Sequence, residues 1–331
     1  INTLRFKRVD RIPRDYWVSP AVWMERAQDF EKFNNLFDFD IIGPEFSYAI
    51  TGREKGNELS DLKYTDAWGV SWERKESGVT GEVKEPILRD ADDLINYKVP
   101  FELITEADFA NVNDFCKRTE KFVLANTQVR PFERIQFLHG TENVYIDIAL
   151  EDENFFDLLN RIHEYGKLEM EKWANTDVDG VMFMDDWGSQ SSLLISPEKW
   201  RAYFKPLYKE YCQILRSKGK YVFMHSDGNI ESIYPDLIEI GVNCINSQLF
   251  CMDIEKLGEL YSGQIVFWGE IDRQYILPFG NQNEVAAAVN RVANALFDKK
   301  KTGVIAQCEW GKDVPLSNMI TVFDTWSRVE V

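Results

Sequence analysis

The sequence has no long hydrophobic run and a shortage of basic residues. No apolar stretch approaches the roughly 20 residues that a membrane-spanning helix needs, so we expect no membrane segment. Lys and Arg total 38 against 55 Asp and Glu, which gives a net charge of -17. This acidic balance argues against nucleic acid as a partner, because contacts to phosphates need clustered Lys and Arg.

Cysteine is scarce and scattered. The five residues are odd in number and include no Cys-x-x-Cys, which argues against a disulfide framework and predicts a reducing, cytoplasmic location. No signal-peptide pattern is present and the first residue is not Met, so we expect a few N-terminal residues to be missing from the sequence. The chain has 331 residues, of which 44% are hydrophobic and 14% aromatic, and this composition excludes disorder.

Eight short apolar runs alternate with longer segments of helical period. Most runs are continuously apolar, as in Val-Met-Phe-Met at 181–184, which is typical of parallel strands covered on both faces. Helices are predicted from Ser196 and Pro197 towards Gly219, and over about 284–296. The predicted strands are 12–18, 40–46, 121–129, 180–186, 220–227, 242–248, 264–272 and 303–309.

Eight strand–helix units predict an α/β fold, a (β/α)8 barrel that forms one domain over residues 1–331. A dinucleotide-binding fold is less favoured, because no strand is followed by a Gly-x-Gly-x-x-Gly turn. Residues 47–100 interrupt the rhythm with several glycines and a Trp-Gly-Val-Ser-Trp alternation at 68–72. We interpret this region as a β-hairpin insertion over the barrel mouth, followed by a helix that starts at Asp90–Asp93.

Candidate functional residues come from the C-terminal ends of the strands, where the active site of such a barrel lies. The alternative is that these positions are polar only because strand ends meet solvent. Asp185 and Glu270 are the candidate catalytic residues; Asp185 could be a general acid or could anchor a ligand. Candidate substrate-binding residues are Tyr16, Trp17, Glu45, Gln128, Asp186, Trp187, Gln248 and Trp310.

A metal site is suggested by three further side chains. His225 and Asp227 alternate by two, so both point to one side of a strand end, and Cys308 ends the eighth run. An imidazole, a carboxylate and a thiolate together suit Zn²⁺ with an open fourth position. The alternative is a hydrogen-bonded histidine and a buried free cysteine.

At these residues the sequence resembles the uroporphyrinogen decarboxylase superfamily over nearly the whole chain. The motifs that carry the resemblance are Arg8-Val9-Asp10-Arg11-Ile12-Pro13, Met184-Asp185-Asp186-Trp187-Gly188-Ser189-Gln190 with Ile195-Ser196-Pro197, Phe223-Met224-His225-Ser226-Asp227-Gly228, Trp268-Gly269-Glu270-Ile271-Asp272 and Val304-Ile305-Ala306-Gln307-Cys308-Glu309. The resemblance implies a (β/α)8 barrel with one of two chemistries.

The decarboxylases of the superfamily use no metal and grip their substrate with an N-terminal Arg-Gln-Ala-Gly-Arg run. Residues 16–20 read Tyr-Trp-Val-Ser-Pro instead, so a polycarboxylate substrate is not expected. The other branch consists of zinc methyltransferases that act with a corrinoid protein and bind zinc through a His-x-Cys pair and a distant Cys. His225 and Cys308 match this pattern, whereas Asp227 stands in place of the middle Cys.

The resemblance therefore implies a methyltransferase that demethylates a small methylated substrate. The aromatic candidates Tyr16, Trp17, Trp187 and Trp310 would suit a methoxylated aromatic compound. Zinc would activate the leaving oxygen or sulfur, and the cobalt of a corrinoid (cobalamin) carried by a partner protein would accept the methyl group. A metal-independent decarboxylase with Asp185 as its acid is the alternative, and a ligand-binding barrel without catalysis is a third possibility. We also expect that the chain can form a homodimer.

Overall fold

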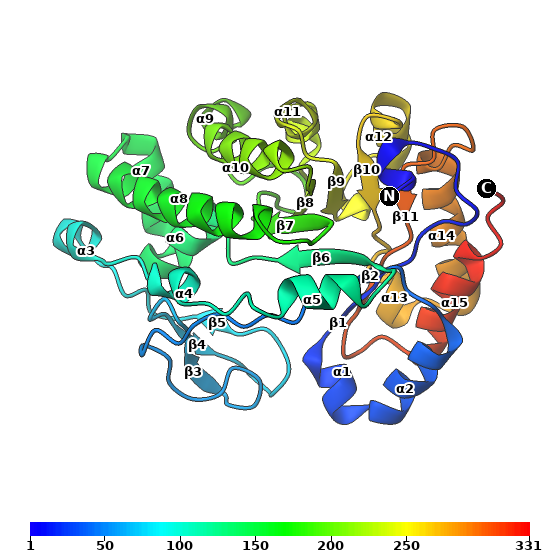
Figure 1. Cartoon of the computed structure of the whole chain (residues 1–331), viewed down its shortest axis with the longest axis horizontal. Coiled ribbons are helices and arrows are strands. Elements are labelled where there is room, and N and C mark those ends of the chain that lie inside the picture. Colours follow the sequence, from blue (N-terminus) through cyan, green and yellow to red (C-terminus); the bar gives the residue numbers. More distant parts are fainter. The chain divides into compact units, whose positions relative to one another are not determined.

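The computed structural model describes residues 1–331, and the chain divides into two compact units. Unit 1 contains residues 1–42, 187–194 and 221–331, and unit 2 contains residues 43–186 and 195–220. Helices and strands alternate in both units (Figure 1). The expectation of one domain over residues 1–331 stays a prediction.

Unit 1 contains four adjacent parallel strands in the order β11-β10-β9-β8. Phe223 of β8 pairs with Cys244 of β9, and Phe267 of β10 pairs with Val304 of β11. A separate parallel pair joins β1 to β12, with Trp17 opposite Glu309. The strands of unit 1 are β1 (Trp17–Val18), β2 (Ile41–Ile42), β8 (Tyr221–Ser226), β9 (Cys244–Ser247), β10 (Val266–Trp268), β11 (Val304–Ile305) and β12 (Glu309–Trp310).

Helices connect these strands and bury their apolar stripes. The longest, α14, starts with a capping box formed by Asn281 and Glu284, and it packs against α12 and α15. Its Val285, Val289 and Val292 are fully buried, as a spacing of three to four residues predicts. The helices of unit 1 are α1 (Pro20–Glu25), α2 (Ala27–Leu36), α11 (Tyr234–Ile240), α12 (Ile254–Tyr261), α13 (Ile276–Phe279), α14 (Gln282–Leu296) and α15 (Leu316–Trp326), with 3-10 turns η1 (Thr3–Arg5), η2 (Glu231–Ile233) and η3 (Leu249–Cys251).

Unit 2 combines one parallel strand pair with a small antiparallel sheet. Strands β6 (Phe122–Asn126) and β7 (Gly180–Met184) pair in parallel, and β3 (Lys63–Thr65), β4 (Ser71–Glu73) and β5 (Glu82–Val83) form the antiparallel sheet. The long helix α8 (Glu153–Ala174) begins at the N-cap Asp152 and packs against α10. The remaining helices are α3 (Ala91–Asn96), α4 (Glu102–Thr105), α5 (Val112–Lys117), α6 (Pro131–His139), α7 (Thr141–Leu150), α9 (Pro197–Tyr203) and α10 (Lys205–Ser217).

Each of the eight predicted strand regions contains an observed strand, and two local predictions need correction. The helix expected from Ser196 towards Gly219 is two helices, since Pro206 has no N–H to continue the first. The inserted region holds three strands instead of a two-stranded hairpin. In the first turn of the inserted region, the Asp66 carboxylate accepts hydrogen bonds from the N–H groups of Trp68 and Val70, both at 2.9 Å.

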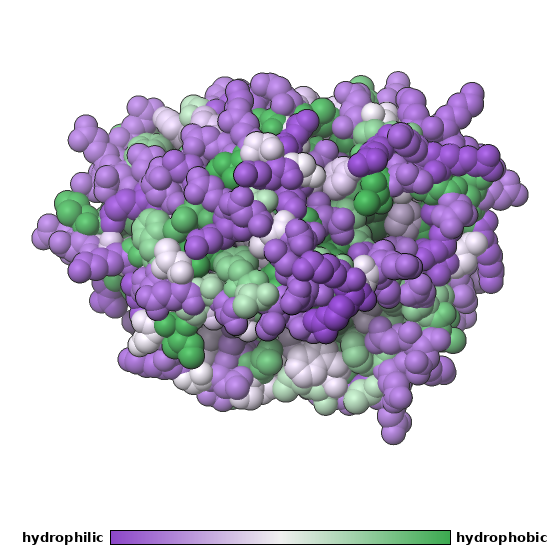
Figure 2. Space-filling model, in the orientation of Figure 1, coloured by the Kyte–Doolittle hydropathy of each residue, from purple (hydrophilic) through white to green (hydrophobic).

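Polar residues cover most of the surface that Figure 2 draws. The hydrophobic residues of this face form small separate groups. No helix is both long enough and apolar enough to cross a membrane.

Candidate functional site

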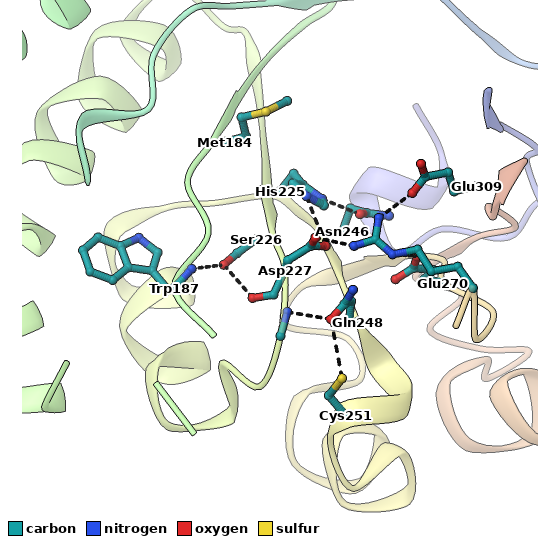
Figure 3. Close-up of polar contacts among 12 residues, drawn as sticks. Met184, Trp187, His225, Ser226, Asp227, Asn246, Gln248, Cys251, Glu270 and Glu309 are labelled. Atoms are coloured by element: carbon teal, nitrogen blue, oxygen red, sulfur yellow. Dashed lines mark hydrogen bonds and ion pairs between the residues drawn. The ribbon is translucent and has the colours of Figure 1, made fainter. Parts of the chain in front are cut away.

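His225 and Asp227 lie side by side at the end of β8 in unit 1. The strand is buried along its apolar residues, and its alternation directs both side chains to one side. His225 Nε2 and Asp227 Oδ1 are 3.4 Å apart (Figure 3). Two hydrogen-bond acceptors at this separation repel one another unless a proton or a metal ion lies between them, so this pair is where a cation or proton would be held.

Asn246 of β9 fixes the orientation of the imidazole. Its Nδ2 donates to the Trp268 carbonyl at 2.6 Å and to Gln307 Oε1 at 3.0 Å, which leaves its Oδ1 as an acceptor for His225 Nδ1 at 2.6 Å. His225 Nδ1 therefore carries hydrogen, and Nε2 is the nitrogen that faces Asp227. The edge of the Trp17 ring packs against the imidazole, with centroids 4.9 Å apart. The histidine is thus held on two sides.

Arg273 lies at the centre of three carboxylates from different strand ends. Its guanidinium donates to Asp227 and to Glu309, and its Nε lies 3.4 Å from Glu270 Oε1. Burial lowers the pKa of Arg273, but the charges of Glu270, Asp227 and Glu309 outweigh it and raise the pKa. We call Asp227, Glu270, Arg273 and Glu309 the arginine cluster; with all three acids ionised, its net charge is negative.

Glu270 is the most perturbed acid of the arginine cluster. Its side chain is 6% exposed. Burial raises the pKa of Glu270 well above its ordinary value, Asp227 and Glu309 raise it further, and Arg273 opposes them. Glu270 is therefore the candidate proton donor of the cluster.

A small cavity of about 100 Å³ opens beside the arginine cluster. Gln248 lines it and accepts hydrogen bonds from the Gly228 N–H at 3.0 Å and from the Cys251 thiol at 3.5 Å. Phe250 and Tyr275 give it aromatic walls. Its lining residues are Gln190, Gln248, Phe250, Cys251, Glu270, Asp272, Arg273, Gln274 and Tyr275.

A close backbone approach within unit 1 holds the loop after β8. Gly228 has a φ of +76°, and a Cβ there would lie 2.1 Å from the Gly188 carbonyl oxygen. The Gly188 N–H donates to the Asp227 carbonyl at 3.0 Å. The two glycines thus let the segment that begins at Trp187 lie directly against the loop that carries Asp227.

Cys308 does not join His225 and Asp227, which corrects the expected three-ligand set. Its side chain is fully buried, and its Sγ lies 3.9 Å from the Met319 sulfur of α15. Irregular chain separates β11 from β12, so strand alternation does not direct this thiol to the barrel mouth. The other oxygen of Asp227 is bonded to Arg273. The predicted ligands therefore do not fit a zinc ion together, and zinc stays a prediction of the resemblance.

Asp185 at the end of β7 has a structural environment, and its expected role as a catalytic acid stays a prediction. Its carboxylate accepts hydrogen bonds from the N–H groups of Phe132 and Glu133, at 2.8 and 2.7 Å, and from the Tyr208 hydroxyl at 2.6 Å. Burial raises the pKa of Asp185 to about 7, against these three bonds. A fully buried carboxylate that satisfies the first turn of α6 has no open face for a substrate.

Four predicted substrate contacts lie elsewhere. The Tyr16 hydroxyl donates to Asn34 at 2.7 Å, and its ring packs on the aromatic side chains of unit 1. Trp187 and Trp310 are fully buried and belong to the core. Glu45 forms an exposed ion pair with Arg118 at 3.2 Å. Within unit 1, Tyr16, Trp187 and Trp310 thus serve the packing of the core and do not line the cavity.

The last two predicted contacts belong to a polar group in unit 2. Gln128 Oε1 accepts a hydrogen bond from Arg134 at 3.0 Å, and Asp186 acts electrostatically on Glu133. Burial raises the pKa of Glu133 to about 8, with Asp186 as the next largest cause. Within unit 1, Trp17 packs against His225 and Gln248 lines the cavity, as their predicted roles require.

Sequence reasoning assigned no role to Arg273 or Glu309. A signal was present, because Arg273 directly follows the predicted strand 264–272 and Glu309 ends the predicted strand 303–309. An arginine among several strand-end carboxylates is the expected counter-charge, so counting charges at the strand ends would have identified it.

Comparisons with known proteins agree with this architecture. The family model described as "Uroporphyrinogen decarboxylase (URO-D)" matches residues 64–329. A methyltransferase from Methanosarcina mazei is similar in structure, with a TM-score of 0.70, 14% identity, and coverage of 98% of this chain and 96% of that chain. That protein is a (β/α)8 barrel, and the predicted fold class is confirmed.

More distant structures also match. An endo-beta-1,4-xylanase from Gloeophyllum trabeum aligns with a TM-score of 0.48 and 11% identity, covering 98% of each chain. A search of curated proteins found no match.

Proposed function

Because the chain belongs to the uroporphyrinogen decarboxylase family, we propose that it is an enzyme of the family's methyltransferase kind. It would move a methyl group from a small methylated substrate to a corrinoid carried by a partner protein. The fold shared with the Methanosarcina mazei methyltransferase supports this proposal.

The observation that carries the choice between the two family chemistries is the charge of the arginine cluster. Three carboxylates surround one guanidinium, and Asp272 adds a further acid to the cavity wall. Such a surface disfavours a polycarboxylate and favours a neutral or cationic methyl donor. The aromatic walls from Phe250 and Tyr275 suit a methoxylated aromatic ring.

Glu270 would supply the proton. A reduced corrinoid carried by the partner protein would supply the nucleophile for the methyl group, and the electron pair of the broken carbon–oxygen bond would stay on the leaving oxygen. A protonated Glu270 gives its proton to that oxygen, so a neutral alcohol or phenol leaves and a glutamate remains. His225, held by Asn246, would position the substrate beside Asp227. No step requires zinc.

The test is methyl transfer to free reduced cobalamin from a neutral methoxyphenol and from a methoxybenzoate anion of similar shape. We expect the corrinoid spectrum to change to the methylated form, faster with the neutral donor. Glu270→Gln should lower turnover by roughly 100-fold or more, the usual contribution of a general acid.

Lys299→Met is the matched control, because Lys299 forms an exposed surface pair with Glu330 at 2.9 Å and does not line the cavity. Its turnover should equal that of the wild type. Absence of methylated corrinoid with every donor, or release of CO2 from the benzoate, would contradict the proposal.

A further inference from the structure

We infer that Arg273 is the resident cation of the arginine cluster and occupies the position that a divalent metal ion would otherwise take. The inference does not depend on the proposed methyl transfer, because its test measures metal binding alone. Its starting point is the disagreement between the expected zinc ligands and their observed arrangement.

The first step is the geometry of the guanidinium. Arg273 donates to Asp227 and Glu309 through two different nitrogens, and its third nitrogen faces Glu270. Asp227 follows β8, Glu270 follows β10 and Glu309 lies in β12. The Arg273 side chain therefore links three strand ends of unit 1. Figure 3 shows Asp227, Glu270 and Glu309 around this position. The planar fork of arginine suits several carboxylates at once.

The second step concerns Asp227, because the Arg273 guanidinium and a divalent metal ion would both bind to its carboxylate. One of its oxygens, Oδ2, is bonded to Arg273, and the other, Oδ1, faces His225 Nε2 at 3.4 Å. A divalent ion bound between Asp227 and His225 would place its charge close to the guanidinium. The two cations repel one another and draw on the same carboxylate, so each weakens the binding of the other.

The third step concerns the ligands that would be released. Without Arg273, Asp227 no longer shares its charge with a guanidinium, and its Oδ1 still lies 3.4 Å from the His225 Nε2 nitrogen. Oxygen and imidazole donors of this kind are suitable zinc ligands. Removing the arginine should therefore increase zinc affinity, although it removes three stabilising contacts.

The experiment is equilibrium dialysis of the full chain against buffered zinc chloride, with bound zinc measured by elemental analysis. We expect Arg273→Met to bind zinc at least tenfold more tightly than the wild type. Arg273→Lys keeps the positive charge and should remain close to the wild type. Lys299→Met removes a positive charge elsewhere in unit 1 and should leave zinc affinity unchanged. Adding His225→Ala to Arg273→Met should abolish the gain.

Arg273→Gln serves as a second variant if Arg273→Met fails to fold, as judged by circular dichroism, because an amide still donates hydrogen bonds to the carboxylates. Unchanged or weaker zinc binding in the folded variants would overturn the inference, since Arg273 would then support a metal site. One tightly bound zinc ion per chain in the purified wild type would overturn it as well.

Discussion

Replacement of Asp185 tests whether this residue stabilises the fold or performs chemistry. Asp185→Ala removes the acceptor for two N–H groups of α6 and for the Tyr208 hydroxyl, all within 2.8 Å of the carboxylate. A hydrogen bond to a charged group contributes about 1.5–3 kcal/mol, and each buried donor left without a partner costs about 1–3 kcal/mol. Because these contributions overlap, we expect the free energy of unfolding to fall by about 4 kcal/mol.

Urea unfolding followed by circular dichroism measures this change. Asp185→Asn keeps one acceptor oxygen and should lose about half as much stability. Asp157→Ala is the control, because Asp157 is a largely exposed helix residue paired with Arg161 at 3.0 Å, and such pairs contribute less than about 1 kcal/mol. A folded Asp185→Ala protein with wild-type stability and no activity would refute the structural role and restore the catalytic one.

Three further predictions concern the stability of variants at Glu169, Gly228 and Cys308. Burial raises the pKa of Glu169 from 4.5 to about 7; the folded state therefore holds this proton more tightly, and the stability gained below pH 4.5 is lost as the pH rises through 7. Glu169→Gln should remove this part of the slope between pH 5 and 7.5 in urea unfolding, and parallel profiles for the two proteins would contradict the assignment. Gly228→Ala should lower the free energy of unfolding by about 2–4 kcal/mol, because its Cβ would lie 2.1 Å from the Gly188 carbonyl oxygen. An unchanged urea midpoint would count against that contact. Cys308→Ala should lower the free energy of unfolding by about 1–2 kcal/mol, because it leaves a small cavity beside Met319. The zinc content should not change. A loss of zinc in this variant would restore Cys308 as a metal ligand.

Local pattern was sufficient to predict the strands and the pairing of His225 with Asp227. The run before His225 is apolar and bounded by polar residues, so its extent could be read directly, and alternation by two places both side chains on one side of the strand. These inferences use only neighbouring residues and standard strand geometry.

The directions of Cys308 and Asp185 could not be predicted in this way. Cys308 lies between two short strands in irregular chain, where no alternation applies. Asp185 lies at a strand end, but its partners come from α6 and α10, which the sequence does not bring together by any local rule. The cluster around Arg273 likewise depends on three strand ends meeting, and no single motif contains it.

The pairing of β1 with β12 has a consequence for synthesis of the chain. Trp17 lies opposite Glu309, roughly 290 residues later. At about 5–20 residues per second, a ribosome takes about 15–60 s to produce the partner strand after the first has emerged. Unit 2 ends at residue 220 and can complete its own contacts first, whereas the first 42 residues wait for the C-terminal part of unit 1. The nascent N-terminal segment, with its aromatic side chains, is thus the part of the chain that a chaperone has longest to bind.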